Sequence, residues 1–242
     1  MTTFTPGTYL VTGASGGIGA ATVRRLVAQE GLEVFASGRD RDKLAALAEE
    51  TGATPLPFDL TKDDEVAQAV GAHTWTGIVN CGGDGGEIAT PQDTDMDVFD
   101  RVMAINARGT MLVTKFAAPG MIEAGRGAIV NVSSQASLVA LHGHISYGSS
   151  KAAVDNITRV SALELGPHGI RVNAVNPTVV MTPMSAWYWD RPETGGELIR
   201  KMPLGRYATE DEIAGPICFL LSEDASMISG VTLPIDGGFS MQ

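Results

Sequence analysis

The alternation of short apolar runs with longer helical patterns constrains the fold of this chain more than any other feature. The apolar runs are rich in β-branched residues, and the segments that follow them repeat apolar residues at helical spacing. The strand-like runs lie at 8–13, 33–38, 53–60, 76–83, 127–134, 170–177 and 230–238. The helical patterns lie at 17–31, 41–52, 63–71, 96–125, 152–169 and 209–225. Such alternation predicts an α/β fold with a doubly wound parallel sheet (Rossmann type) of about seven strands and helices on both faces.

No repeat, low-complexity tract or linker divides the 242 residues, so we expect a single domain over residues 1–242. One stretch breaks the alternation, a loop at about 182–205 that contains Trp187, Tyr188 and Trp189 in a row. A long loop after the carboxyl end of a strand is typical of a lid or a substrate-binding loop. Aromatic residues in a loop are also typical of a subunit contact, and the sequence leaves both interpretations open.

The charge balance and the apolar pattern exclude several classes of partner. A net charge of −11, from 28 acidic and 17 basic residues, is unsuited to nucleic acid, because phosphate contacts require clustered Lys and Arg. No apolar run approaches the roughly 18 residues of a membrane span, and the N-terminus lacks the pattern of a signal peptide. We therefore expect a cytoplasmic protein with no nucleic-acid or membrane partner. Its two cysteines and four histidines show no ligand spacing, so no metal site is expected.

A glycine cluster, LVTGASGGIGAATV, lies between the first strand and the first helix. Gly13 permits a tight turn, Gly17 allows the backbone to approach a pyrophosphate, and Gly19 lets helix and strand pack closely. The free N–H groups and the dipole at the start of the helix also favour phosphate. This position within a strand–helix unit predicts a dinucleotide-binding loop.

The end of the second strand bears on the choice of dinucleotide. At the positions where Asp or Glu would bind the ribose hydroxyls of NAD, the sequence has Ser37, Gly38 and Arg39. Arginine binds a 2′-phosphate through charge-assisted hydrogen bonds, so the sequence favours NADP(H), with NAD(H) as the alternative. Asp40, the next residue, is a candidate N-cap for the following helix.

A tyrosine and a lysine lie four residues apart in ISYGSSKAAV (145–154), a run with helical character. Tyr147 and Lys151 therefore share one helical face. Alone, such a pair is usually an ordinary surface pair, so its meaning depends on the remaining motifs.

The ordered set of motifs resembles the short-chain dehydrogenase/reductase family over essentially the whole chain. The matching residues are Thr12, Gly13, Gly17, Gly19, Asp59, Asn80, Gly82, Gly83, Asn106, Ser134, Tyr147, Lys151, Asn176 and Pro177. Segments such as AIVNVSSQAS and ALELGPHGIRVNAVNPTVVMT look closest to the dicarbonyl/L-xylulose reductase branch, which includes tetrameric carbonyl reductases. The resemblance therefore implies a homotetramer.

The resemblance implies a catalytic group of Asn106, Ser134, Tyr147 and Lys151. Tyr147 is then the general acid/base. Lys151 holds the nicotinamide ribose and lowers the tyrosine pKa, which is about 10 in a free phenol. Ser134 donates to the carbonyl oxygen of the substrate, and Asn106 anchors a water relay. The family's spacing favours Ser134 over its neighbour Ser133 for this role.

The remaining contacts also follow from the resemblance. The implied cofactor contacts are Gly13, Ser15, Gly17, Ile18, Gly19, Arg39, Asp59, Asn80, Gly82, Tyr147, Lys151, Pro177, Val180 and Thr182. The implied substrate contacts are Ser134, Gln135, His144 and Trp189. The sequence departs from the family at Gly82, where alanine is usual. It also has Ser15 and Gly16 where NADP-using members of the branch carry a basic residue, which leaves Arg39 as the main 2′-phosphate donor.

The resemblance thus implies an NADP(H)-dependent oxidoreductase of a small carbonyl or alcohol. Its expected substrate is a dicarbonyl or a ketose such as L-xylulose, with polyol oxidation in reverse. One alternative is a reductase of another carbonyl class, such as a 3-oxoacyl thioester, although the loop at 182–205 is compact and aromatic. The other is a dinucleotide-binding sensor without catalysis, in which the four catalytic positions would have eroded, whereas all four are present.

Overall fold

The computed structural model describes residues 2–241, with the side chains of all of them except Pro183 and Met184. Its centre is a seven-stranded parallel sheet with the strand order β3-β2-β1-β4-β5-β6-β7. The strands are β1 (Gly7–Thr12), β2 (Leu32–Ala36), β3 (Thr54–Pro55), β4 (Gly77–Asn80), β5 (Gly127–Val132), β6 (Ile170–Pro177) and β7 (Thr232–Ile235). The chain reverses its direction of winding between β1 and β4, which is where open α/β sheets bind ligands. The predicted doubly wound sheet and its seven strands are confirmed.

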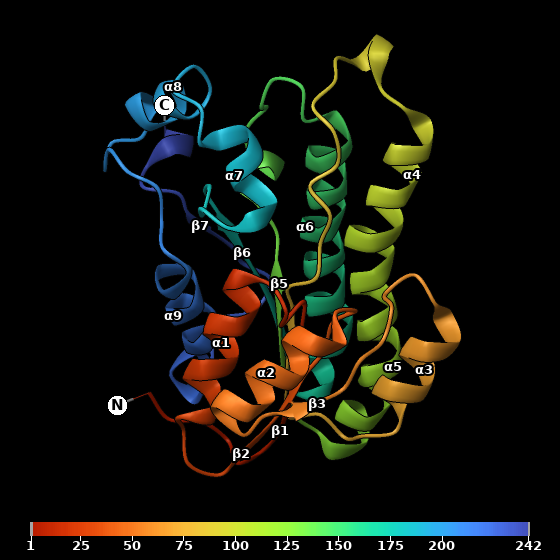
Figure 1. Cartoon of the computed structure of the whole chain (residues 1–242). Coiled ribbons are helices and arrows are strands. Elements are labelled where there is room, and N and C mark those ends of the chain that lie inside the picture. Colours follow the sequence, from red (N-terminus) through yellow and green to blue (C-terminus); the bar gives the residue numbers. More distant parts are fainter. Residues whose placement is uncertain (1, 242) are drawn as a thin grey trace.

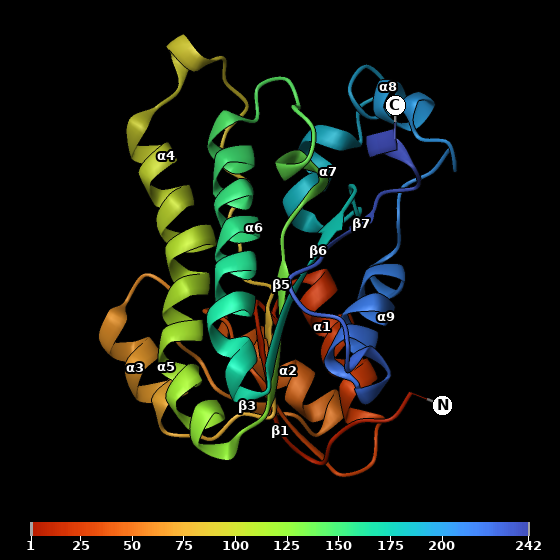
Figure 2. The ribbon, with the colours of Figure 1, turned by 180° about the vertical axis from the view of Figure 1, so that it is seen from behind.

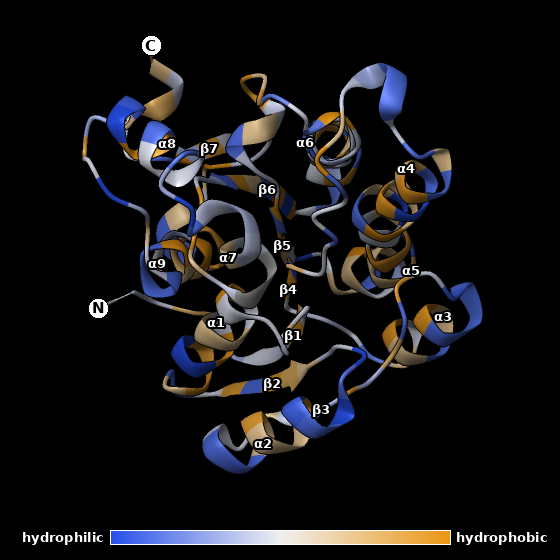
Figure 3. Ribbon diagram, turned by 45° about the horizontal axis from the view of Figure 1, so that its top comes forward, coloured by the Kyte–Doolittle hydropathy of each residue, from blue (hydrophilic) through white to orange (hydrophobic). Residues whose placement is uncertain are grey.

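Helices cover both faces of the sheet (Figures 1 and 2). One layer consists of α1 (Gly17–Val27), α2 (Arg41–Thr51) and α9 (Glu210–Leu221). The other consists of α3 (Asp63–Gly71), α4 (Met96–Met103), α5 (Gly109–Ala124) and α6 (Ile145–Leu165). Figure 3 shows the sheet between the two layers, with hydrophilic residues on the outward parts of α2 and α3.

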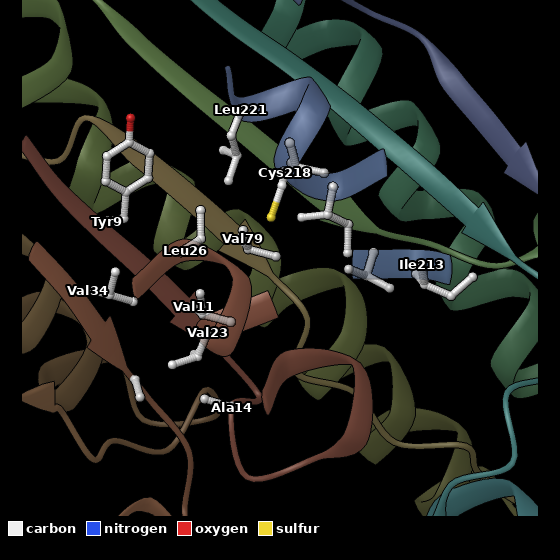
Figure 4. Packing of buried hydrophobic residues seen from close by; sticks show 14 of the residues in the cluster. Tyr9, Val11, Ala14, Val23, Leu26, Val34, Val79, Ile213, Cys218 and Leu221 are labelled. Atoms are coloured by element: carbon white, nitrogen blue, oxygen red, sulfur yellow. The ribbon is translucent and has the colours of Figure 1, made fainter. Parts of the chain in front are cut away.

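Each layer encloses its own apolar core, because successive side chains of a strand point to opposite faces of the sheet. Tyr9 and Val11 of β1 pack beneath α1 and α9, as the close view in Figure 4 shows. Leu10, between them, packs in the second core on the other face. All three side chains are almost completely buried, which explains why the strands read as continuous apolar runs.

Three element boundaries differ from the sequence prediction. The third strand, expected at 53–60, is reduced to Thr54–Pro55, because Pro55 and Pro57 have no N–H group to pair with a neighbour. The long helical region at 96–125 contains a π-helical turn, Ala104–Arg108, between α4 and α5. The helix expected at 152–169 begins earlier, at Ile145, and ends at Leu165.

The loop expected at 182–205 contains two short helices, α7 (Pro183–Trp189) and α8 (Gly195–Lys201). Both lie beyond the carboxyl ends of the strands, near the C-terminal end of the chain (Figures 1 and 2). Ser185 fixes the start of α7, since its hydroxyl accepts a hydrogen bond from the Thr182 N–H at 3.0 Å. Within residues 2–241, no helix combines the length and apolarity needed to cross a membrane.

Candidate active site

A cavity of about 690 Å³ opens at the carboxyl ends of the central strands and brings most of the predicted site residues together. Its size is usual for a small-molecule or cofactor site. The predicted residues in its wall are Gly13, Ser15, Gly17, Ile18, Gly19, Arg39, Asp59, Gly82, Ser134, Gln135, His144, Tyr147, Lys151, Pro177, Val180, Thr182 and Trp189. Asn80 and Asn106 are buried behind the wall and do not line it.

The glycine loop forms a cradle at the start of α1. Gly13 has a φ of +66°, which favours glycine, and a Cβ on Gly19 would lie 2.3 Å from the Gly13 carbonyl oxygen. Among the described residues, no acceptor pairs with the N–H groups of Gly17, Ile18 and Gly19. Three free N–H groups at a helix N-terminus fit a pyrophosphate.

Thr12 connects this cradle to the turn after β4. Its hydroxyl oxygen accepts hydrogen bonds from the N–H groups of Cys81 at 3.1 Å and Gly82 at 3.3 Å. A Cβ on Gly82 would lie 2.5 Å from a terminal methyl of Leu60, so an alanine here would require the Leu60 side chain to move. The backbone N–H groups of this turn are anchored on Thr12.

The end of the cavity next to β2 is positively charged. Arg39 lines it together with Lys43 and Arg24, two residues that the sequence analysis did not single out. Arg24 forms two hydrogen bonds to Glu50, whereas Arg39 has no ion pair within the described part of the chain. The Arg39 guanidinium is therefore free to bind an anion.

Asp40 does not share this wall. It is the N-cap of α2, where its carboxylate accepts a hydrogen bond from the Lys43 N–H at 3.0 Å. The Asp40 carboxylate therefore caps α2 instead of facing the position of a ribose, which agrees with the N-cap predicted from the sequence.

Asp59 lines the same end of the cavity, in the segment beyond β3. Burial raises its pKa, but hydrogen bonds from Thr61 and the charge of Arg39 lower it more, so the pKa of Asp59 lies below its usual range. Its Oδ1 accepts from both the N–H and the hydroxyl of Thr61, each at 2.9 Å. Asp59 therefore presents an ionised acceptor at the rim of the site.

Asn80 lies at the carboxyl end of β4, as predicted, and its side chain bonds within the protein. Its amide donates to the Asn131 carbonyl oxygen at 2.9 Å, and Asn131 donates to the Thr158 hydroxyl at 2.9 Å. This buried chain joins β4 to β5 and α6 beneath the cavity. Asn80 thus supports the floor of the site instead of lining it, a role that depends on partners distant in the sequence.

Ser134, Tyr147 and Lys151 meet in the middle of the cavity. Burial raises the pKa of Tyr147, and a hydrogen bond from Ser134 acts in the opposite direction. The Lys151 Nζ lies 5.7 Å from the centre of the tyrosine ring and donates to the Val132 carbonyl at 2.8 Å. Burial also lowers the pKa of Lys151 to about 8. The phenol of Tyr147 is therefore protonated at neutral pH and lies next to the Ser134 hydroxyl.

Ser133, the competing serine, has a structural contact. Its hydroxyl donates to the backbone carbonyl of Lys151 at 3.1 Å and holds α6 against the end of β5. The Ser134 hydroxyl accepts from the Ala136 N–H at 3.1 Å, so its own proton is available to a ligand or to Tyr147. The local geometry thus favours Ser134 as the group that faces the substrate.

Asn106 lies in the π-helical turn, where such irregularities often mark functional positions. Its side chain forms three hydrogen bonds: it accepts from the Asp84 N–H at 2.7 Å, and it donates to the Asp84 carbonyl and to the Ser150 hydroxyl, each at 2.9 Å. This side chain clamps the loop after β4 to the helix, with both N–H groups of its amide donated.

Cys81 follows β4 and also lines the cavity. Burial raises the pKa of its thiol to about 11, against the opposite effect of Lys151. The thiol is therefore protonated at neutral pH and is a poor nucleophile.

The far end of the cavity is built from aromatic side chains. His144 stacks on Trp189 with a ring-centre distance of 5.6 Å and an angle of 23°, and it meets the edge of Tyr188 at 5.7 Å. Its Nδ1 lies 2.8 Å from the His142 carbonyl, so Nδ1 carries the proton and Nε2 is an acceptor. Burial lowers the pKa of His144, which keeps the ring neutral at pH 7.

Gln135 adds an unsatisfied polar group to this end. Its side chain is 1% exposed and lines the cavity, yet neither amide atom has a hydrogen-bond partner among the residues that the structure describes. A buried amide without partners is costly, so the position is suited to a ligand that supplies a donor and an acceptor. The wall here includes the apolar Ile88 and Leu141, neither of which any sequence motif indicated.

The class of protein follows from this arrangement, in which a phosphate cradle and a proton-transferring tyrosine share one cavity: it is a dinucleotide-dependent oxidoreductase. A family model described as enoyl-(acyl carrier protein) reductase matches residues 13–240. L-xylulose reductase from Mus musculus is 43% identical and covers 95% of this chain and 95% of the relative. D-erythrulose reductase from Gallus gallus is 42% identical and covers 95% and 94%.

A solved short-chain type dehydrogenase/reductase from Mycobacterium ulcerans has the same fold. The TM-score is 0.95 at 33% identity, and the superposition covers 99% of this chain and 92% of that one. The chain belongs to the short-chain dehydrogenase/reductase family, as the sequence motifs predicted, and this membership implies a nicotinamide dinucleotide as cofactor.

Proposed function

We propose that the protein is an NADP(H)-dependent reductase of a small dicarbonyl or ketose, such as L-xylulose, and oxidises the corresponding polyol in reverse. The observation that carries this proposal is the buried amide of Gln135, which has no hydrogen-bond partner in the described part of the chain and lies in the wall that also holds Tyr147. Relatives named L-xylulose reductase and D-erythrulose reductase, which match over nearly the whole chain, support a small hydroxylated ketone.

In the proposed reduction, Ser134 and Tyr147 both donate hydrogen bonds to the carbonyl oxygen of the substrate. The bound nicotinamide supplies the hydride to the carbonyl carbon. Tyr147 transfers its proton to the oxygen, and the Lys151 ammonium stabilises the phenolate that results. In the oxidation, the Tyr147 phenolate accepts the proton from the alcohol.

Substrate recognition would fall to the uncharged end of the cavity. The Gln135 amide provides a donor and an acceptor, and Nε2 of His144 accepts from a hydroxyl group. Trp189 and Tyr188 offer flat surfaces to the carbon chain. Because the charged residues of the wall lie at the dinucleotide end and at Lys151, an uncharged substrate fits better than a phosphorylated one. The aromatic residues Trp187, Tyr188 and Trp189 in this wall also disfavour a long acyl thioester.

The test is a panel of small diketones, ketoses and polyols assayed with NADPH and with NADH. We expect turnover of diacetyl and of a ketose such as L-xylulose, with NADPH preferred. If all small substrates are inert while bulky ketones or acyl thioesters react, the substrate class proposed here is wrong.

NADP(H) selection is proposed to rest on Arg39, with Lys43 as the second cation that replaces the missing basic residue of the glycine loop. We expect Arg39→Ala to raise the KM for NADPH about 10- to 100-fold and the KM for NADH less than about threefold, because only NADPH carries the 2′-phosphate. Lys43→Ala should act in the same direction but more weakly, since its ammonium also lies 3.4 Å from Asp40. Steady-state kinetics with each cofactor decides this, and an equal loss with both would contradict it.

The pH dependence should follow the charge of Lys151. Its pKa of about 8 lies below the ordinary 10.5, so the ammonium is present below pH 8 and is lost as the pH rises through that value. We expect kcat/KM for NADPH, which reports on the free enzyme, to be flat below about pH 8 and to fall about tenfold per pH unit above it. A profile that stays flat to pH 10 would show that the neutral amine suffices.

We further propose that the chain forms a homotetramer in the cytoplasm and folds as one domain. Apolar side chains on the outer faces of α5 (Met111, Ile122) and α6 (Val160, Leu163) are exposed in the single chain, which suits a subunit contact. A monomer in sedimentation at micromolar concentration would contradict the assembly.

A further inference from the structure

Glu210, the first residue of α9, places a carboxylate in the part of the cavity where a pyrophosphate would bind. Its Oε1 lies so close to Gly17 that a Cβ on this glycine would be 1.9 Å away from it. Gly17 begins α1, whose free N–H groups form the phosphate cradle. Within residues 2–241, however, the Glu210 carboxylate accepts no hydrogen bond from them. The Glu210 carboxylate thus lies beside N–H groups that suit an anion, but in the described structure it does not form hydrogen bonds with them.

Glu210 differs from the other acidic residues of its helical turn. Asp211 pairs with Arg25 at 3.1 Å, and Glu212 pairs with Arg206 and also closes the capping box of α9. Glu210 has no cation within 4.0 Å in the described chain.

Arg24, a cation of the same cavity wall, is already occupied by Glu50 at 2.6 and 2.8 Å. The charge of Glu210 therefore remains available to act on whatever binds in the cradle.

We propose that Glu210 sets the affinity for the dinucleotide by repelling and competing with its pyrophosphate. The side chain must leave the space next to Gly17 before the phosphates bind, and its charge then remains within a few ångströms of theirs. Both effects weaken binding and speed release of the cofactor after each turnover. The role of Glu210 rests on the proposed function in one respect, which is that the ligand must contain a pyrophosphate. It does not depend on whether the cofactor is NADPH or NADH.

The test is Glu210→Gln, which keeps the shape of the side chain and removes the charge. We expect the Kd of NADPH and that of NADH to fall by the same factor, about three- to tenfold, in titrations of cofactor fluorescence. The Kd of adenosine 2′-monophosphate, which lacks a pyrophosphate, should not change. Asp211→Asn is the matched control, because it removes the same charge from the same turn at a residue outside the cavity wall, and its effect should stay below about twofold.

The proposal is overturned if Glu210→Gln binds both dinucleotides as the native enzyme does or more weakly. It is also overturned if Asp211→Asn tightens binding equally, since the effect would then reflect net charge alone. Tighter binding of both cofactors without any preference for NADPH would support the role of Glu210 and refute the NADP(H) assignment, so the two failures are distinguishable. Unfolding temperatures within a few degrees of the native value, measured by circular dichroism, establish that each variant is folded.

Discussion

Tyr147→Phe should lower kcat by about three orders of magnitude while the Kd of NADPH changes less than about threefold. Phenylalanine preserves the ring that packs in the cavity wall, but it has no proton to give to the carbonyl oxygen. Ser134 remains as a hydrogen-bond donor, so substrate binding is retained and the loss appears in the chemical step. The measurement is steady-state kinetics with the best ketone of the panel, together with a fluorescence titration of the cofactor.

Tyr207→Phe provides the matched control, because Tyr207 is not among the residues of the cavity wall and its hydroxyl donates to the Trp189 carbonyl at 3.2 Å. We expect this variant to keep kcat within about threefold. If Tyr147→Phe retains a tenth or more of the native kcat, Tyr147 is not the proton donor.

Lys151→Met should reduce kcat/KM for NADPH by at least about a hundredfold, because it removes both the ammonium that supports the phenolate and the donor to the nicotinamide ribose. Methionine has a similar length, so the packing of α6 against β5 is retained. Residual activity above a tenth of the native value would contradict the role assigned to the lysine.

The same variant should not lose stability. Lowering the pKa of Lys151 from 10.5 to about 8 means that burial disfavours its charge, which costs the folded state roughly 3 kcal/mol below pH 8. The folded state binds fewer protons than the unfolded chain between pH 8 and 10.5, so this penalty diminishes as the pH rises through that window. Methionine removes the penalty but leaves the Val132 carbonyl without its donor, and we expect a melting temperature equal to or above that of the native protein. A fall of more than about 5 °C would show that the lysine stabilises the fold.

The sequence predicted the sheet, its strand number and the glycine cradle because these depend on local periodicity and on backbone freedom at single positions. Gly13 and Gly19 are examples, since their neighbours along the chain already demand a tight turn and a close helix. The third strand was overestimated because two prolines interrupt a run that is otherwise apolar.

The partners of side chains were harder to predict. Asn80 was expected at the cofactor and Asn106 as the anchor of a water relay, and the structure adds that their amides bind Asn131, Asp84 and Ser150, which come from distant segments. The position of Glu210 in the phosphate cradle likewise depends on the packing of α9 against α1 and has no sequence motif. The role of a polar residue therefore cannot be predicted from its type alone where residues distant in the sequence provide its hydrogen-bond partners.

The π-helical turn at Ala104–Arg108 has a further consequence for how this region evolves. It joins α4, which packs against α6, to α5, which packs against α3. In an α-helix each backbone N–H bonds to the carbonyl four residues earlier, whereas in a π turn it bonds to the carbonyl five residues earlier, so the turn absorbs one extra residue. Deleting one residue in this turn would restore a regular helix with α4 and α5 in nearly the same relative orientation, but it would shift Asn106 away from Asp84 and Ser150. Loss of a residue here is therefore expected to release the loop after β4 rather than to misalign the two helices.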